Sequence, residues 1–279
     1  MVAKAPHNII YKQRMAWREM VFMVLPIKKS IIYGPVNSRR LGPSLGINLM
    51  PRGLKYCDFD CLYCHYGRTS VPKRFSDKTD IFPEIQEVLR EVEIWLRSDV
   101  VFGYLTFSGS GEATLHPQFA ELANGCRSLA RSLRPHVKVT LLSNSSTCND
   151  PAVVSALRFI DLPIMKLDVG DPALFRQINR PAAGVEFDEI VAGLAALKNI
   201  TIQTLFLSGD PDNSTPMAVG KWLDQLELIR PDAVQIYTLD RPFARKTKSG
   251  TVNIRKISDR RMAEIVDKGK QTGIKIDRY

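Results

Sequence analysis

Residues 56–66 read Tyr-Cys-Asp-Phe-Asp-Cys-Leu-Tyr-Cys-His-Tyr, and this segment determines how the remaining sequence is interpreted. Cys57, Cys61 and Cys64 follow Cys-x3-Cys-x2-Cys spacing, so one loop can aim three sulfurs at a common point. Thiolates hold iron–sulfur clusters, and a 4Fe-4S cube has four iron corners. Three protein ligands would therefore leave one iron able to bind another molecule.

The same cysteines are also compatible with a structural zinc ion of the Cys3His type, with His65 or a distant histidine as fourth ligand. Zinc sites usually split their ligands into two pairs on separate elements, whereas all three cysteines here arrive on one loop. The spacing therefore favours an iron–sulfur cluster. The alternative is a basic RNA-binding protein that holds a structural zinc.

The length and net charge of the chain limit its fold and its partners. A chain of 279 residues is long enough for one barrel of repeated strand-helix units. Its net charge of +10 favours acidic partners such as nucleic acid or phosphorylated metabolites. Clustered cysteines without other obvious pairs indicate metal ligands and a reduced, cytoplasmic location. The apolar residues 20–27 include Pro26 and fall short of a membrane span, so we expect neither anchor nor signal peptide.

Strand and helix patterns alternate along the chain. Buried strands are expected at residues 47–50, 104–108, 137–143, 164–169, 201–207 and 233–237. Helices are expected at residues 82–97, 117–133, 151–159, 187–198 and 217–229. Apolar strands joined by helices predict an α/β fold with a parallel sheet buried on both faces. Right-handed crossovers curve such a sheet toward a barrel, with the chemistry at the carboxyl ends of its strands.

This pattern suggests three parts. Residues 1–30 form an N-terminal extension, in which Trp17, Met20, Val21 and Val24 have helical spacing. Residues 31–245 form the barrel domain. Residues 246–279 form a basic C-terminal extension with a helix expected at residues 259–270.

A glycine-rich turn follows the second expected strand. Gly109 and Gly111 would let the backbone approach a ligand closely, and Glu112 could accept hydrogen bonds from an ammonium group.

Polar side chains also end the later strands. Asn144 follows the third strand, and Lys166 and Asp168 lie at the end of the fourth. Such groups at a barrel mouth need partners, which a bound ligand could supply. The alternative is that Asn144 and Asp168 only cap the following helices. Gln203 and Tyr237, on the last two strands, are expected to point into the cavity.

The cysteine loop, with aromatic Tyr63 before its last cysteine, resembles the signature of the radical S-adenosylmethionine (SAM) enzymes. In this family the amino and carboxylate groups of SAM chelate the open iron of a 4Fe-4S cluster. The resemblance implies a partial (β/α)6 TIM-like barrel and cluster ligands at Cys57, Cys61 and Cys64. It also implies an external electron donor of the flavodoxin or ferredoxin type. Reduction then cleaves SAM to a 5′-deoxyadenosyl radical, which abstracts hydrogen from the substrate.

The glycine-rich turn resembles the Gly-Gly-Glu element with which this family holds the amino group of SAM. Ala113 stands where the family usually has proline. The ribose hydroxyls and carboxylate of SAM would partner the polar groups at the other strand ends. The expected cofactor contacts are therefore Gly109, Gly111, Glu112, Asn144, Lys166 and Asp168.

Four further segments resemble the wyosine-synthase-like branch, which includes tRNA-modifying enzymes. They are residues 34–46, residues 166–181, residues 204–206 and residues 237–242. Two departures stand out: residues 1–56 lack the cysteines that hold a second cluster in the archaeal tRNA enzymes, and a flavodoxin-like domain is missing. The resemblance leaves tRNA and a small phosphorylated molecule as substrate classes.

Four arginines are candidates for binding an anionic substrate bidentately. They are Arg39, Arg40, Arg180 and Arg241. The alternative is that they are solvated at the surface or form structural ion pairs.

The remaining cysteines are not expected to be ligands. Cys126 lies within an expected helix, where a buried thiol packs as a small hydrophobic group. Cys148 lies in the loop after the third strand, so a hydrogen donor or a substrate contact is an alternative to ordinary packing.

Overall fold

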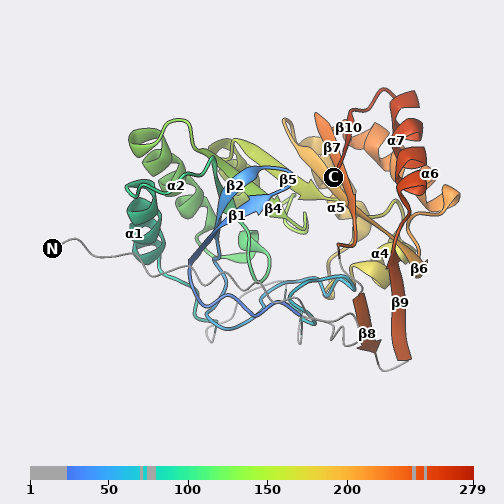
Figure 1. The fold of residues 1–279 in the computed structure, drawn as a ribbon, viewed down its shortest axis with the longest axis horizontal. Helices are drawn as coiled ribbons and strands as arrows, with labels where there is room; N and C mark the ends of the chain where they lie inside the picture. Colours follow the sequence, from blue (N-terminus) through green and yellow to red (C-terminus); the bar gives the residue numbers. More distant parts are fainter. Residues whose placement is uncertain (1–23, 70–71, 74–79, 241–242, 248–249) are drawn as a thin grey trace, which may run out of the picture.

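A curved sheet runs through the centre of the molecule (Figure 1). The computed structural model describes residues 24–69, 72–73, 80–240, 243–247 and 250–279. The main path of the sheet has the order β1-β2-β3-β4-β5-β6-β7-β10. Its strands are β1 (Ile32–Ser38), β2 (Gly42–Ile47), β3 (Tyr104–Phe107), β4 (Lys138–Ser143), β5 (Leu162–Lys166), β6 (Thr201–Asp210), β7 (Ala233–Thr238) and β10 (Ile276–Arg278).

Strands β2 to β7 pair in parallel, each with the next along the chain. β1 pairs antiparallel with β2 at one edge, and β10 pairs parallel with β7 at the other. Within the described residues these two edges do not pair, so the sheet stays open. The expected α/β fold, a partial barrel built on six parallel strands, is confirmed.

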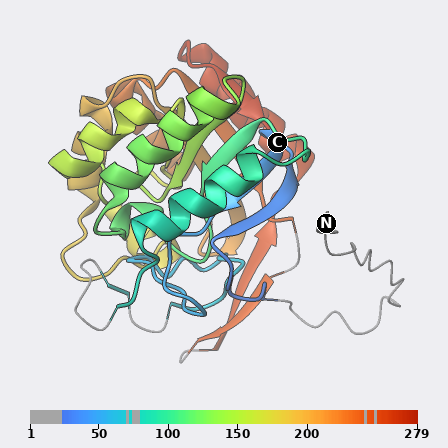
Figure 2. The same ribbon diagram turned by 90° about the vertical axis from the view of Figure 1, so that its left-hand side faces the viewer.

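Helices follow the strands and cover the outer face of the sheet, as Figure 2 shows for α1, α2 and α3. The helices are α1 (Ile85–Leu96), α2 (Phe119–Leu133), α3 (Pro151–Ala156), α4 (Pro172–Ile178), α5 (Phe187–Ala196), α6 (Pro216–Ile229) and α7 (Asp259–Gln271). Helices α3, α4 and α6 each begin with proline after a capping Asp150, Asp171 or Thr215 side chain. A proline there loses no hydrogen bond, because the first helical N–H has no partner inside the helix.

Several elements differ from the sequence expectation. The first buried strand is β2 at Gly42–Ile47 rather than residues 47–50. Residues 48–50 are buried but lie beyond the ladder, and the Asn48 side chain accepts a hydrogen bond from the Ser110 N–H at 3.0 Å. The expectation did not include β1, α4 or the strands after β7. The helix expected around Trp17 lies outside the described residues.

Strand β6 continues beyond the parallel sheet and carries a ribbon. Its outer end, from Leu207 to Asp210, pairs antiparallel with β9 (Gly250–Lys256), which pairs with β8 (Phe243–Thr247). The ribbon lies at the same end of the molecule as the cysteine loop (Figures 1 and 2). The basic segment after residue 245 thus borders the barrel mouth and also supplies β10. Its separation as an extension stays a prediction.

Among the described residues, no helix is both long and apolar enough to cross a membrane.

Candidate active site

A cavity of about 280 Å³ opens at the carboxyl ends of the parallel strands. All of the predicted ligands and cofactor contacts except Asp168 line it. They are Cys57, Cys61, Cys64, Gly109, Gly111, Glu112, Asn144 and Lys166. The fold therefore brings together groups that are up to about 110 residues apart in the sequence.

Backbone hydrogen bonds hold the cysteine loop on the mouth of the barrel. The Tyr56 N–H donates to the Ser110 carbonyl at 3.1 Å, and the Glu112 N–H donates to the Tyr56 carbonyl at 3.0 Å. On the other side, the Leu62 N–H donates to the Ile178 carbonyl at 2.9 Å. The protein backbone itself therefore fixes both ends of the loop.

Packing explains the two predicted glycines. A Cβ atom on Gly111 would lie 1.7 Å from the Tyr56 carbonyl oxygen. Gly109 has a φ of +141°, and a Cβ there would lie 2.3 Å from the Asn48 side-chain oxygen. Both positions thus need glycine for the close approach of the cysteine loop and of Asn48. Contact of these glycines with a cofactor stays a prediction.

The cysteine sulfurs accept N–H hydrogen bonds. Cys57 Sγ accepts from the Phe59 N–H at 3.4 Å and from Asn144 Nδ2 at 3.6 Å. Cys61 Sγ accepts from Asn179 Nδ2 at 3.6 Å. Hydrogen bonds of this kind tune iron–sulfur clusters. Burial raises the pKa of Cys61 to about 11 and that of Cys57 well above its usual value, so metal binding would have to displace protons.

A single metal ion needs ligands that converge on one point. Among the described residues, His, Cys, Asp and Glu side chains nowhere form a group of three that could hold one ion. Ligands of a 4Fe-4S cube each bind a different iron and need not converge in that way. Three thiols that line one cavity are compatible with such a cluster.

Glu112 is buried at the end of β3 and accepts hydrogen bonds at both oxygens. Oε1 accepts from the Thr114 N–H at 3.1 Å and its hydroxyl at 2.7 Å, and Oε2 accepts from the Asn144 N–H at 2.6 Å. Burial raises the pKa of Glu112 to about 7, although these hydrogen bonds oppose the shift. An adjacent cation would favour the ionised form.

Asn144 and Asp168 do not cap helices. The Asn144 amide donates to Asp58 Oδ1 at 2.6 Å, and Asp150 caps the following helix α3. Helix α4, which follows Asp168, is capped by Asp171. The capping interpretation of both residues is therefore wrong, and Asn144 links the end of β4 to the cysteine loop.

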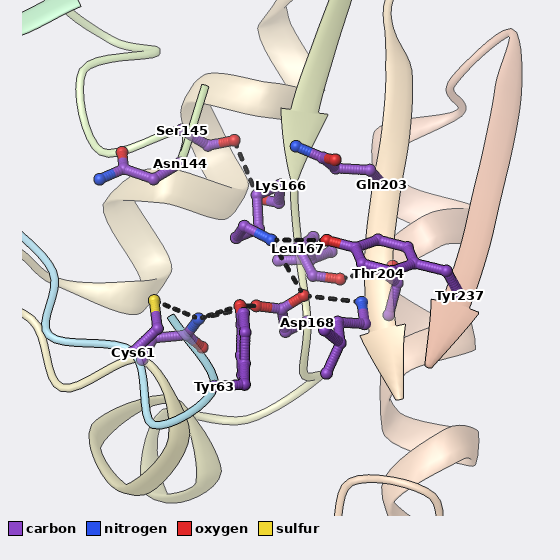
Figure 3. A network of polar contacts seen from close by, with 12 residues as sticks. Cys61, Tyr63, Asn144, Ser145, Lys166, Leu167, Asp168, Gln203, Thr204 and Tyr237 are labelled. Carbon is purple, nitrogen blue, oxygen red and sulfur yellow. Dashed lines mark hydrogen bonds and ion pairs between the residues drawn. The ribbon is translucent and has the colours of Figure 1, made fainter. Parts of the chain in front are cut away.

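Asp168 lies behind the cavity wall at the centre of a polar network (Figure 3). Its carboxylate accepts from the Tyr63 hydroxyl, from Asn179 Nδ2 at 2.7 Å and from the Leu205 N–H at 2.9 Å. Lys166 Nζ lies 3.6 Å from Asp168 Oδ1, the oxygen that also accepts from the Leu205 N–H. With this set of protein partners, Asp168 orients the groups around it, and its contact with a cofactor stays a prediction.

Lys166 enters the cavity from β5. Burial is the largest single influence on Lys166 and lowers its pKa, but Asp168, Tyr237 and Cys61 together raise the pKa by more, so the ammonium group persists. Its Nζ donates to the Tyr237 hydroxyl at 3.3 Å and lies 5.3 Å from the centre of the Tyr63 ring. A fixed positive charge therefore faces the space beside Cys61.

Asn179 connects Cys61 to Asp168 and is a site residue to which we assigned no role from the sequence. It lies within residues 166–181, but its contact with Cys61 depends on the fold, because that cysteine lies on a distant segment of the chain. Gln203 and Tyr237 line the cavity as expected.

The candidate arginines lie in different surroundings. Arg40 lines the cavity, whereas Arg39 forms an exposed ion pair with Asp240. Arg180 lines a different cavity and lies 3.9 Å from Asp60. Arg241 falls outside the described residues.

The remaining cysteines lie away from this site. Cys126 is fully buried in α2. Cys148 Sγ donates to the Ile190 carbonyl at 3.3 Å, on helix α5. Burial raises the pKa of both thiols to about 12. These contacts favour ordinary packing for Cys148.

Comparison with known proteins agrees with this geometry. The profile of the radical SAM superfamily matches residues 54–215, from the cysteine loop to the residue that caps α6. The chain belongs to the radical SAM superfamily. It is therefore an enzyme, and membership implies SAM and an iron–sulfur cluster in general. Radical SAM enzymes typically need an electron donor.

Relatives of this radical SAM enzyme include UPF0026 proteins. It is 34% identical over 217 residues to a UPF0026 protein of Synechocystis, covering 76% of each chain. It is 30% identical to a UPF0026 protein of Methanocaldococcus jannaschii, covering 78% of this chain and 66% of the relative.

A solved structure shares the fold. The structure of TYW1 with a lysine-pyruvate adduct bound has a TM-score of 0.58 and 14% identity. The match covers 83% of this chain and 75% of that one. At this identity the likeness concerns the fold alone.

Proposed function

We propose that Cys57, Cys61 and Cys64 hold a 4Fe-4S cluster with which the enzyme cleaves SAM and abstracts hydrogen from an anionic substrate. One observation carries the proposal: the three thiols share a single cavity with Glu112 and Lys166. Held by these three thiolates, the cluster would supply the electron for reductive cleavage of SAM to methionine and a 5′-deoxyadenosyl radical. The cofactors supply this chemistry, and the chain supplies orientation.

The chain's own residues would orient SAM. Glu112 would accept a hydrogen bond from the amino group. Lys166 would attract the carboxylate, and Asn144 would offer polar atoms beside Cys57. Asp168 would hold Lys166 and Tyr63 from behind. The buried aromatic and aliphatic walls around these groups would exclude water from the reacting atoms.

The proposal requires one cluster per chain. A second would need three more thiolates, and only Cys126 and Cys148 remain of the five cysteines. Both are buried away from the cavity. The electron would come from an external flavodoxin or ferredoxin, and the anionic substrate would be tRNA or a small phosphorylated molecule.

Anaerobic reconstitution tests this function. The reconstituted protein should be brown, contain about four irons per chain and, once reduced, release 5′-deoxyadenosine from SAM. Iron and sulfide analysis, with chromatography of the nucleoside, measures these quantities. A colourless protein that binds one zinc and leaves SAM intact would contradict the proposal and support the zinc alternative.

Glu112→Gln should weaken SAM binding without removing iron. The substitution keeps the size of the side chain but removes the charge that accepts from the amino group. A charge-assisted hydrogen bond contributes about 1.5–3 kcal/mol, or roughly ten- to hundredfold in affinity. Equilibrium dialysis of SAM against the reconstituted protein measures the change.

The matched control for Glu112 is Glu121→Gln, because Glu121 is exposed on α2. That variant should bind SAM like the unchanged protein. Equal SAM affinity in both variants would give Glu112 a structural role only.

A further inference from the structure

A second cavity, of about 400 Å³, adjoins the cavity that contains the cysteines. Arg40, His65 and Tyr237 line both, so the two cavities share a wall. The second cavity lies between the β1–β2 hairpin and the inner face of the sheet. Its volume is in the range of small-molecule sites, about 300–1,000 Å³.

Two arginines in the hairpin turn reach across the open side of the barrel. Arg39 donates to both carboxylate oxygens of Asp240, after β7, at 2.6 and 2.7 Å. Arg40 NH1 donates to Gln203 Oε1, on β6, at 2.6 Å. The turn at one edge of the sheet therefore contacts strands near the other edge. Strand pairing leaves this side of the barrel open, and the two arginine contacts enclose the second cavity there.

Most polar groups of this cavity already have partners within the protein. The hydroxyls of Ser44 and Thr106 lie 2.6 Å apart, and those of Tyr33 and Ser108 are equally close. These pairs satisfy each other and need no ligand.

Arg40 differs from these groups because its charge is unmatched. Its contacts in the described part of the chain are the neutral Gln203 amide and the Tyr237 ring, 5.0 Å from the guanidinium carbon. Asp240 is the sole acidic side chain among the described lining residues, and Arg39 binds both of its oxygens. An arginine keeps its charge in proteins. The half-buried guanidinium therefore presents a net positive charge to the cavity.

We infer that Arg40 binds an anionic group of the substrate, a phosphate or a carboxylate, in the second cavity. The inference rests on the proposed function, because it places that group beside the cavity in which SAM would be cleaved. Gln203 and Tyr237 hold the guanidinium in place, and the N–H groups that Gln203 does not use can donate to an oxyanion. The anion belongs either to a free small molecule or to one nucleotide of an RNA.

Calorimetric titration of the reconstituted full chain, with SAM present, tests the inference with inorganic phosphate and with succinate. Arg40→Gln should weaken binding of the preferred anion about tenfold or more, because it removes a charge-assisted hydrogen bond. Gln203→Glu should cause a similar loss, because its carboxylate would neutralise Arg40 while keeping the hairpin contact. This second variant separates loss of charge from misfolding of the turn.

Arg176→Gln is the matched control. Arg176 lines a separate cavity of about 460 Å³ together with Arg68 and Arg180. The variant should bind the anion like the unchanged protein. Unchanged affinity in both the Arg40 and Gln203 variants, loss confined to the Arg176 variant, or no saturable binding of either anion would overturn the inference.

Competition separates the two sources of the anion. Displacement of the bound anion by nucleoside 5′-monophosphates would support a free small molecule. Displacement by tRNA alone, weakening steeply with salt, would support an RNA nucleotide at Arg40. SAM cleavage by the unchanged protein is measured separately, so the inference and the proposed function can fail independently.

Discussion

Cys61→Ala should abolish the visible absorbance of the reconstituted protein and all release of 5′-deoxyadenosine from SAM. Cys61 is 9% exposed, lines the cavity and accepts an N–H hydrogen bond at its sulfur. An alanine there would leave two thiolates, which cannot hold the proposed cluster with one open iron. Visible absorbance spectroscopy and nucleoside chromatography measure the two losses.

Cys126→Ala is the control for this prediction. Cys126 is a fully buried thiol of α2 that does not line the cavity. The variant should keep its absorbance and its SAM cleavage, with only a modest loss of stability. An iron–sulfur spectrum that persists in Cys61→Ala would contradict the ligand assignment.

Asp168→Ala should destabilise the fold by about 3–5 kcal/mol, because it removes one partner of a buried ion pair. Lys166 would keep a buried positive charge without its carboxylate. The Tyr63 hydroxyl and the Leu205 N–H would also lose their acceptor. For a chain of this size the midpoint of thermal unfolding should fall by roughly 10 °C. Chemical and thermal unfolding of the unreconstituted protein measure the change.

Asp171→Ala provides a reference for the loss of folding stability in Asp168→Ala. Asp171 caps α4 by accepting from the Ala173 and Leu174 N–H groups, each at 3.0 Å. Loss of such a cap costs about 1 kcal/mol. A loss in Asp168→Ala no larger than in Asp171→Ala would show that the network contributes little.

Strands β3 to β7 could be predicted because their residues are largely apolar and buried. The same criterion missed β1, whose residues after Ile32 are largely exposed and include Gly34 and Pro35. It also missed β10, which has three residues and no fully buried side chain. These strands form through pairing with β2 and β7, and a pattern read along one segment does not contain that pairing.

The site was predictable where its residues follow one another in the sequence. The cysteine spacing and the glycine-rich turn each lie within one loop. Asn179 could not be assigned, because it lies 118 positions from Cys61 and its amide meets that sulfur only in the folded chain. The role of Asp168 behind Tyr63 likewise depends on how β5 packs against the loop.

Backbone hydrogen bonds attach the cysteine loop to the barrel, and this attachment affects how the enzyme would respond to oxygen. In proteins such as zinc fingers, the metal supplies the folding energy, and its removal unfolds the chain. Here hydrogen bonds from Tyr56 and Leu62 to carbonyls of the barrel hold the loop independently of any metal. Oxygen that destroys the cluster would then leave the thiols in position. The damage could be repaired by supplying iron, sulfide and reductant to an intact protein, without degradation and new synthesis.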